Sequence, residues 1–582
     1  MTEHRGQASR LLPFESFPSS AWALVKDLPI IFAGLALFYG LVSLTHYWTE
    51  TVNTAAEIQL QPWALPRYAL FSLARLTAAY VVSLVFTLVY AYVAAHNARA
   101  ERILIPMLDT LQSIPVLSFL PSVMISMVAL FPTRQLGPEL GSILLIFTGQ
   151  VWNMTFSVYS SMKSIPREMQ EATQIYRLSW WQRFTQLELP YSAIGLVWNS
   201  MMSVAGGWFF LMPCEMFVLG KRDLRLPGLG SYLQTAANAG DTRAILWGVF
   251  AMVMVIVLMD QLIWRPVIAW SEKFKFETVE AAQAPRSPIL TMLRHSRVVS
   301  RLTRAALDPG REAITLFFAR RRAAHPIDDG RGGARRWLGW AAGLAAVGGL
   351  LYGVVKMSVM VTAITRLELH GIFIGAGATF LRVELTLVLA ALWTIPVGVY
   401  VGLRPNVAAF VQPVAQIAAS VPATALFPIV LLMLIRVGGG MGIAAIVLLL
   451  LGTQWYLLFN VIAGAMAIPT DLKEVCDIYH LGTVQRWRKL LLPGIFPYLL
   501  TGLVTASGGA WNASIVAEYF HFNKQTISTT GLGATISAAT DSGNDPLLLG
   551  ATIMMVAMVV TINRLLWRRL YGLAQTRYKL ES

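Results

Sequence analysis

The chain has little charge and almost no cysteine. Only 13% of its 582 residues are charged, whereas 56% are hydrophobic, and the mean hydropathy is +0.58. This composition excludes a large soluble enzyme and is typical of a polytopic membrane protein. Cys214 and Cys476 are too few for a disulfide framework or a cysteine metal cluster, so we expect two buried thiols.

Motifs for catalysis are also missing. No G-x-x-x-x-G-K-[ST] occurs, so the chain has no phosphate-binding loop for ATP, and any such energy must come from other polypeptides. The eight histidines show no H-E-x-x-H or other paired ligand spacing. We therefore predict no catalytic residues, no metal site and no cofactor in this chain, which argues against a membrane-embedded enzyme.

The net charge of +15 is distributed unevenly. Lys and Arg concentrate in the segments between apolar spans, as the positive-inside rule requires, so the charge does not indicate nucleic acid. The arginine-rich segments all fall on one side of the membrane, which places both termini in the cytosol. The N-terminus lacks the features of a signal peptide, so we expect the first apolar span to be retained.

Apolar stretches long enough to cross a bilayer recur along the chain. Six lie near 28–48, 70–95, 116–131, 143–162, 194–219 and 245–270, and six more near 337–360, 380–402, 417–435, 443–465, 498–520 and 547–567. The fold class is thus an all-α polytopic membrane protein with about 12 transmembrane helices. Because each half has an even number of spans, the halves are expected to be parallel six-helix repeats.

The spans divide the chain into five parts. These are a cytosolic tail (1–27), a first membrane module (28–270), a basic cytosolic linker (271–336), a second module (337–570) and a cytosolic C-terminal tail (571–582). Within the linker, residues 289–307 place arginines among apolar residues at helical spacing. This segment either lies on membrane lipid as an amphipathic helix or is a plain solvated linker.

One soluble stretch occurs twice. Residues 166–190 and 469–493 align without a gap and are identical at 10 of 25 positions. The offset of 303 also relates Trp152 to Trp455 and Glu215 to Glu518, and upstream it becomes 307. Both copies are charged islands between apolar spans, so we expect each to dock another protein.

The duplicated stretch resembles the EAA loop of bacterial ABC importer permeases, whose pattern is E-A-A, three residues, G, nine residues and I-x-L-P. The matching residues are Glu171, Ala172, Thr173, Leu187 and Pro190 in the first copy, and Glu474, Val475, Cys476, Leu490 and Pro493 in the second. Arg177 and His480 stand at the glycine position of the pattern, and Gly482 is a candidate for the turn in the second copy.

With motifs such as Gly206-Gly207-Trp208 and Gly228-Leu229-Gly230, the chain resembles the nitrate, sulfonate, taurine and bicarbonate permeases. The resemblance implies two fused type I modules in the bacterial cytoplasmic membrane that import a small anion. It also implies that both loops are gripped by two cytosolic ABC ATPase subunits, which bind ATP and Mg. A periplasmic or surface substrate-binding protein is a further candidate partner.

Placing an ionisable residue inside a membrane span costs free energy, so such residues are candidates for a function. Arg75 and Arg382 occupy equivalent positions, as do Glu215 and Glu518. Either each arginine pairs with a glutamate, or the two arginines attract an anion along a central pathway. The repeated Ser-x-Pro breaks also point to that pathway. They comprise Ser113 and Pro115, then Ser420 and Pro422.

An alternative function is an ion-coupled secondary transporter with parallel internal repeats. Such a carrier needs no ATPase and has no use for two loops with the coupling spacing. The duplicated loop is therefore the feature that favours an importer permease.

Overall fold

The computed structural model describes residues 57–274 and 351–577, apart from 113, 220–221, 437, 439 and 523–524, together with the isolated positions 48, 290–291 and 348–349. The described chain is almost entirely helical, as predicted, with one short antiparallel strand pair in each half. The predicted N-terminal tail, residues 578–582 of the C-terminal tail, most of the linker, the predicted span at 28–48 except for position 48, and most of the first half of the predicted span at 337–360 lie outside the described residues.

The α-helices, π-helical turns and strands occur in the same order in both halves, and among the described residues the 3-10 turns η1, η2 and η5 occur in the first half. The first half consists of η1 (Pro62–Ala64), α2 (Leu65–His96), α3 (Ala98–Gln112), η2 (Val116–Phe119), α4 (Leu120–Leu130), α5 (Leu136–Lys163), α6 (Arg167–Ile175), α7 (Trp180–Arg183), η3 (Phe184–Glu188), α8 (Leu189–Glu215), β1 (Val218–Leu219), β2 (Arg222–Asp223), α9 (Leu229–Ala239), α10 (Thr242–Met259), η4 (Asp260–Trp264), α11 (Arg265–Ser271) and η5 (Glu272–Phe274). The second consists of α16 (Arg366–Gly402), α17 (Pro405–Ser420), α18 (Ala423–Arg436), α19 (Met441–Met466), α20 (Thr470–Ile478), α21 (Thr483–Arg486), η8 (Trp487–Leu491), α22 (Leu492–Ala517), β3 (Tyr519–Phe522), β4 (Gln525–Ser528), α23 (Leu532–Ser542), α24 (Asp545–Ile562), η9 (Asn563–Trp567) and α25 (Arg568–Arg577).

Helix ends repeat together with the helices. Asp241 caps α10 by accepting hydrogen bonds from two backbone N–H groups, and Asn544 caps α24 in the same way from Leu547. The preceding helices, α9 and α23, end at Gly240 and Gly543, both with φ of 67°. Glycine suits this left-handed position because it has no Cβ. The local chemistry of the turns was thus duplicated with the fold.

Seven described helices are long and apolar enough to cross a membrane. The number of 12 is therefore not established, and two predicted spans are shorter than expected. The span near 116–131 is a 3-10 turn followed by the 11-residue α4, and the span near 417–435 is broken between Ser420 and Ala423. Pro115 and Pro422 lie at these breaks, where proline lacks the N–H that a continuous helix needs.

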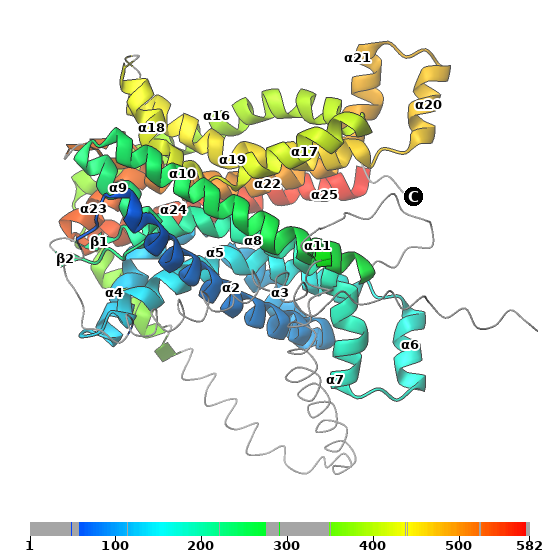
Figure 1. The fold of residues 1–582 in the computed structure, drawn as a ribbon, viewed down its shortest axis with the longest axis horizontal. Coiled ribbons are helices and arrows are strands. Elements are labelled where there is room, and N and C mark those ends of the chain that lie inside the picture. Colours follow the sequence, from blue (N-terminus) through cyan, green and yellow to red (C-terminus); the bar gives the residue numbers. More distant parts are fainter. Residues whose placement is uncertain are drawn as a thin grey trace, which may run out of the picture.

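The long helices of each half pack side by side: α2, α5 and α8 in the first, and α16, α19 and α22 in the second. Figure 1 shows the short helices α6, α7, α20 and α21 projecting from the same end of this bundle. The opposite end carries α9, α23 and the strand pair β1–β2. The bundle therefore has two chemically different ends.

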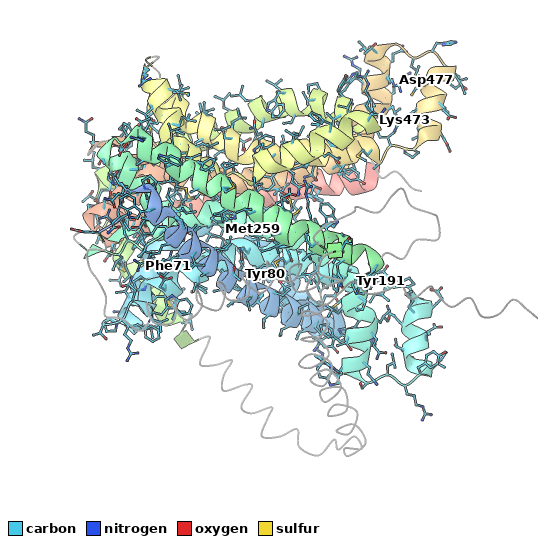
Figure 2. The ribbon with its side chains drawn as sticks, viewed as in Figure 1. Phe71, Tyr80, Tyr191, Met259, Lys473 and Asp477 are labelled. Carbon is cyan, nitrogen blue, oxygen red and sulfur yellow. The ribbon has the colours of Figure 1, made fainter. Side chains whose placement is uncertain are left out.

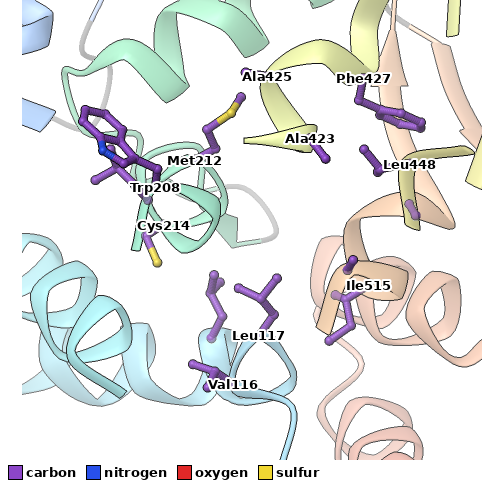
Figure 3. Close-up of a cluster of buried hydrophobic side chains, with 14 of the residues drawn as sticks. Val116, Leu117, Trp208, Met212, Cys214, Ala423, Ala425, Phe427, Leu448 and Ile515 are labelled. Carbon is purple, nitrogen blue, oxygen red and sulfur yellow. The ribbon is translucent and has the colours of Figure 1, made fainter. Parts of the chain in front are cut away.

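A single apolar core joins the two halves. The largest buried cluster takes residues from both modules, and Figure 3 shows Leu117, Met212, Phe427 and Ile515 within it. Polar contacts also cross the boundary: the Leu117 N–H donates to Asn512 Oδ1 at 3.3 Å. The two modules therefore form one folded body.

Candidate functional site

The two projecting loops have the same local geometry. In each, a nine-residue helix, α6 or α20, is joined to a four-residue helix, α7 or α21, by a turn. The turn residues are Arg177 (φ 49°) and His480 (φ 46°), which are the only non-glycine residues with positive φ in the described chain. Gly482 does not form the turn, because it caps α21 with φ of −61°.

Backbone hydrogen bonds close both turns identically. The Leu178 N–H donates to the carbonyl of Thr173, and the Leu481 N–H donates to the carbonyl of Cys476, both at 3.0 Å. This is the Schellman arrangement, in which a left-handed residue ends a helix. The residue at the glycine position of the sequence pattern therefore makes the turn, although neither copy has glycine there.

The tips of the loops are apolar and exposed. Ile175 and Tyr176 are 78% and 77% exposed, and Ile478 and Tyr479 are 72% and 74% exposed. Exposed apolar side chains that lie together are a common feature of protein-interaction surfaces. The predicted loop residues differ in exposure. Glu171, Glu474 and Val475 are exposed, and Thr173, Cys476 and Leu490 are buried. The remaining four are half-buried: Ala172, Leu187, Pro190 and Pro493.

The second loop carries charges on its outer face. Figure 2 marks Lys473 and Asp477 on α20. The Asp477 carboxylate accepts a hydrogen bond from Arg486 Nη1 at 2.9 Å, which ties α20 to α21 across the turn. Because the Asp477 side chain is 67% exposed and that of Arg486 is 33% exposed, this pair contributes little stability.

Two ion pairs of Glu188 stabilise the base of the first loop. Glu188, in η3, is buried, and its Oε1 lies 2.8 Å from His96 Nε2 and 2.6 Å from Arg183 Nε. Nearby, Lys163 and Tyr159 donate hydrogen bonds to the Glu101 carboxylate, which hold its pKa below the usual range. Polar contacts thus link α2 to the base of the first loop, and they link α3 to the end of α5 that leads into this loop.

The base of the second loop is apolar. Leu403 and Leu491 stand at the positions of His96 and Glu188, and both belong to a separate apolar cluster with Cys476 and Leu490. Apolar contacts therefore replace the ion pairs. Both cysteines are buried, as predicted.

A buried ion-pair network stands at the other end of the first module. Arg75 is fully buried and donates to both oxygens of Glu139, from Nε at 2.6 Å and from Nη2 at 2.7 Å. Its Nη1 donates to Glu215 Oε1 at 2.7 Å. Ser72 Oγ and the Gly230 N–H also donate to Glu215. The carboxylate therefore joins α2 to α8 and to the start of α9.

The second module repeats this arrangement. Arg382 Nη1 donates to Glu518, which also accepts hydrogen bonds from the Thr379 hydroxyl and the Gly533 N–H. Of the two alternatives for the arginines, the structure thus has ion pairing with the glutamates. A role of these residues in translocation remains a prediction.

The two networks differ in one carboxylate. The position equivalent to Glu139 is Gly442, since 442 − 139 = 303, so Arg382 has only one glutamate partner. Sequence reasoning missed Glu139 because it is not repeated and lies just before the predicted span at 143–162. Its place at the start of an apolar helix was the available signal, since an acidic residue there needs a partner.

Glycines allow the carboxylates to approach the backbone. A Cβ on Gly228 would collide with the carboxylate of Glu215, and a Cβ on Gly531 would collide with that of Glu518. Both glycines have extended backbones, with φ of 178° and 175°, so space rather than conformation requires them. This accounts for the repeated Gly-Leu-Gly motif.

A cavity of about 580 Å³ lies between the modules, bordered by α5, α8, α22, η9 and α25. A smaller cavity of about 110 Å³ adjoins it and is lined by Val421 and Pro422, at the predicted helix break. Pro115, Arg75, Arg382, Glu215 and Glu518 line neither cavity, whereas Ser113 and the side chain of Ser420 lie outside the described part of the chain.

A third cavity, of about 570 Å³, opens between the modules at the end remote from the loops. Tyr519 and His521 line it. The Tyr519 hydroxyl donates a hydrogen bond to Asp541 Oδ2 at 2.7 Å, and His521 Nε2 forms a hydrogen bond with the same oxygen at 2.9 Å. Burial and the neighbouring Asp541 carboxylate raise the pKa of the Tyr519 hydroxyl. The space between the modules is thus hollow near both ends and closed by the apolar core between them.

Residues 84–262 and 394–577 each match the family described as "Binding-protein-dependent transport system inner membrane component". The chain belongs to this family. It therefore carries two copies of an ABC transporter permease domain and is a multi-pass protein of the bacterial inner membrane. The duplication seen in the loops and ion-pair networks is the duplication of this domain.

Curated relatives carry the same kind of domain. The chain is similar to the nitrate import permease protein NrtB of Leptolyngbya laminosa, with 28% identity over 196 residues, which cover 34% of this chain and 67% of the relative. It is 31% identical to the bicarbonate transport system permease protein CmpB of Synechococcus elongatus over 148 residues, covering 25% and 52%. It is 30% identical to the taurine transport system permease protein TauC of Escherichia coli over 197 residues, covering 33% and 68%. The matched stretches thus span between half and two thirds of these relatives.

Proposed function

We propose that the chain is the complete membrane pathway of an ATP-driven importer for a small anion, of the nitrate, bicarbonate, taurine or sulfonate kind. Two copies of a separate ATPase subunit bind ATP and Mg and grip the two loops. A substrate-binding protein delivers the anion to the opposite, outer end. The loop end and both termini then face the cytosol.

The observation that carries this proposal is the identity of the two loops. They project from the same end, turn at equivalent residues and expose the same Ile-Tyr pair. A homodimeric ATPase has two identical grooves, so two matching apolar tips are the surface it requires. The different attachment of each loop is hidden inside the membrane module, where the ATPase does not reach.

The proposed route follows the hollow space between the modules. A substrate enters at the cavity lined by Tyr519 and His521 and leaves through the larger cavity near the loops. The core around Leu117 and Ile515 closes the route between them. Movement of the loops, driven by ATP, separates the modules there, because the long helices run from each loop to this core.

Purification of the full chain from its native membranes tests the proposal. We expect two copies of an ATPase subunit to accompany it after mild detergent extraction, and we expect no ATP hydrolysis by the chain alone. ATP hydrolysis by the isolated chain would overturn the assignment. Anion uptake that depends on an ion gradient and not on ATP would favour the secondary transporter instead.

A further inference from the structure

The cavity of about 580 Å³ between the modules is lined by many polar side chains. Its hydrogen-bonding side chains come from both halves: Gln112, Asn153, Ser203, Thr501, Thr505, Ser507, Asn512, Asn563, Arg568 and Tyr571. Among the residues described as lining it, Arg568 is the only charged one, and none is acidic. A cavity with one arginine and many neutral donors favours a negatively charged occupant.

The equivalent arginine of the first module has an acidic partner that Arg568 lacks among the described residues. In the first module, the equivalent Arg265 has its Nε 3.4 Å from Asp260 Oδ2. In the second, Asn563 stands at the position of Asp260, since 563 − 260 = 303. Within the described part of the chain, no ion pair or hydrogen bond of Arg568 is present. The Arg568 side chain is exposed at the edge of the cavity, so its donors face solvent and are available to a bound group.

Two further positions beside this cavity are polar in the second module and apolar in the first. Thr501 and Tyr571 line the cavity, and their hydroxyl oxygens lie 2.9 Å apart. Their equivalents in the first module are Trp198 and Ile268, which are apolar. These two positions are thus polar in the second module and apolar in the first.

We propose that Arg568 is the residue that selects the charge of the transported substrate, by binding a small oxyanion or sulfonate through its planar guanidinium. Such groups accept two parallel N–H bonds from arginine, and a cavity of about 580 Å³ holds them with their water. This inference rests on the proposed function. Arg568 begins α25, which runs toward the loop end of the bundle (Figure 1), so the subsite lies in the inner half of the route.

Binding to the purified full chain tests this without the ATPase. The probes are methanesulfonate and its neutral analogue dimethyl sulfone, at constant ionic strength, and the readout is the thermal unfolding midpoint in detergent. We expect methanesulfonate to raise the midpoint of the wild type in a saturable manner and dimethyl sulfone to have no such effect. Equal effects of the two probes, or no saturable effect of methanesulfonate, would refute the charge-selecting role.

Variants locate the site. Arg568→Gln should raise the apparent dissociation constant for methanesulfonate about tenfold, which is 1.4 kcal/mol, whereas Arg568→Lys should keep part of the affinity. Asn563→Asp recreates the pair of the first module and should also weaken binding, because the new carboxylate occupies the guanidinium.

Matched controls come from the first module. Arg265→Gln and Asp260→Asn should leave the affinity unchanged. If Arg568→Gln and Arg265→Gln weaken binding equally, the effect is general surface charge and the inference fails. Because no ATPase takes part, these results are independent of whether the loops couple to ATP hydrolysis.

Discussion

Arg177 and His480 adopt the same left-handed backbone conformation 303 residues apart, at the turns of the two loops. Each sits where the importer pattern has glycine, and each ends a helix in the same Schellman arrangement. A residue with a Cβ pays about 1–2 kcal/mol for this conformation. That both turns persist without glycine indicates that their shape is required.

This strain predicts opposite effects of two substitutions. Replacing both residues by glycine should preserve the loops, while replacing both by valine should weaken them, because a β-branched residue tolerates positive φ poorly. Hydrogen exchange of the Leu178 and Leu481 amides measures this. We expect about tenfold faster exchange in the valine variant, corresponding to about 1.4 kcal/mol. Equal exchange in both variants would show that the turns are not strained.

Arg75 should stabilise the first module. Arg75→Gln leaves two buried carboxylates without their cation, and breaking a buried pair in this way costs about 3–5 kcal/mol. The thermal unfolding midpoint should fall and should recover when Glu139→Gln and Glu215→Gln are added. Arg382→Gln should cost less, because Arg382 is 10% exposed and has one glutamate partner.

The competing role of these arginines has a different signature. If Arg75→Gln with Arg382→Gln keeps the unfolding midpoint but lowers anion uptake, the arginines belong to the pathway after all.

The base of the first loop should tolerate the apolar residues that stand at the base of the second loop. His96→Leu with Glu188→Leu copies Leu403 and Leu491, so we expect a folded protein whose ATP-dependent uptake stays within about twofold of the wild type. Glu188→Leu alone removes the carboxylate that holds His96 and Arg183 and should reduce coupling more. The ratio of uptake to ATP hydrolysis, measured for both variants, distinguishes these outcomes. A double variant worse than the single one would contradict this interpretation.

Much of the fold was predictable because the duplication provides an internal comparison. Matching prolines predicted the breaks at Pro115 and Pro422. The turn at Arg177 was not predicted, because the importer pattern has glycine at that position and Gly482 was the candidate in the second copy. The length of the broken spans was overestimated, since hydropathy counts apolar residues across a proline without registering the lost hydrogen bond.

The residues that sequence reasoning missed are those that are not duplicated. Gly442 stands at the position of Glu139 in the other half, and Arg568 differs from Arg265 through its neighbours, among them Asn563. These residues lie at positions where the two halves differ in sequence. A comparison of the halves identifies only the residues that both have, so it does not find them. The cavity itself forms only when α5, α22 and α25 come together, which no local pattern in the sequence reveals.

The most direct test of the central claim is coupling through the loops. Glu171→Arg with Glu474→Arg reverses an exposed charge on both loops and leaves the bundle untouched. In proteoliposomes that contain the chain and its ATPase, ATP hydrolysis and uptake of nitrate, bicarbonate or taurine are measured together, with each single variant as control. We predict that the double variant inserts normally but loses ATP-dependent uptake, while the single variants keep part of it. Normal uptake per ATP hydrolysed by the double variant would contradict the account.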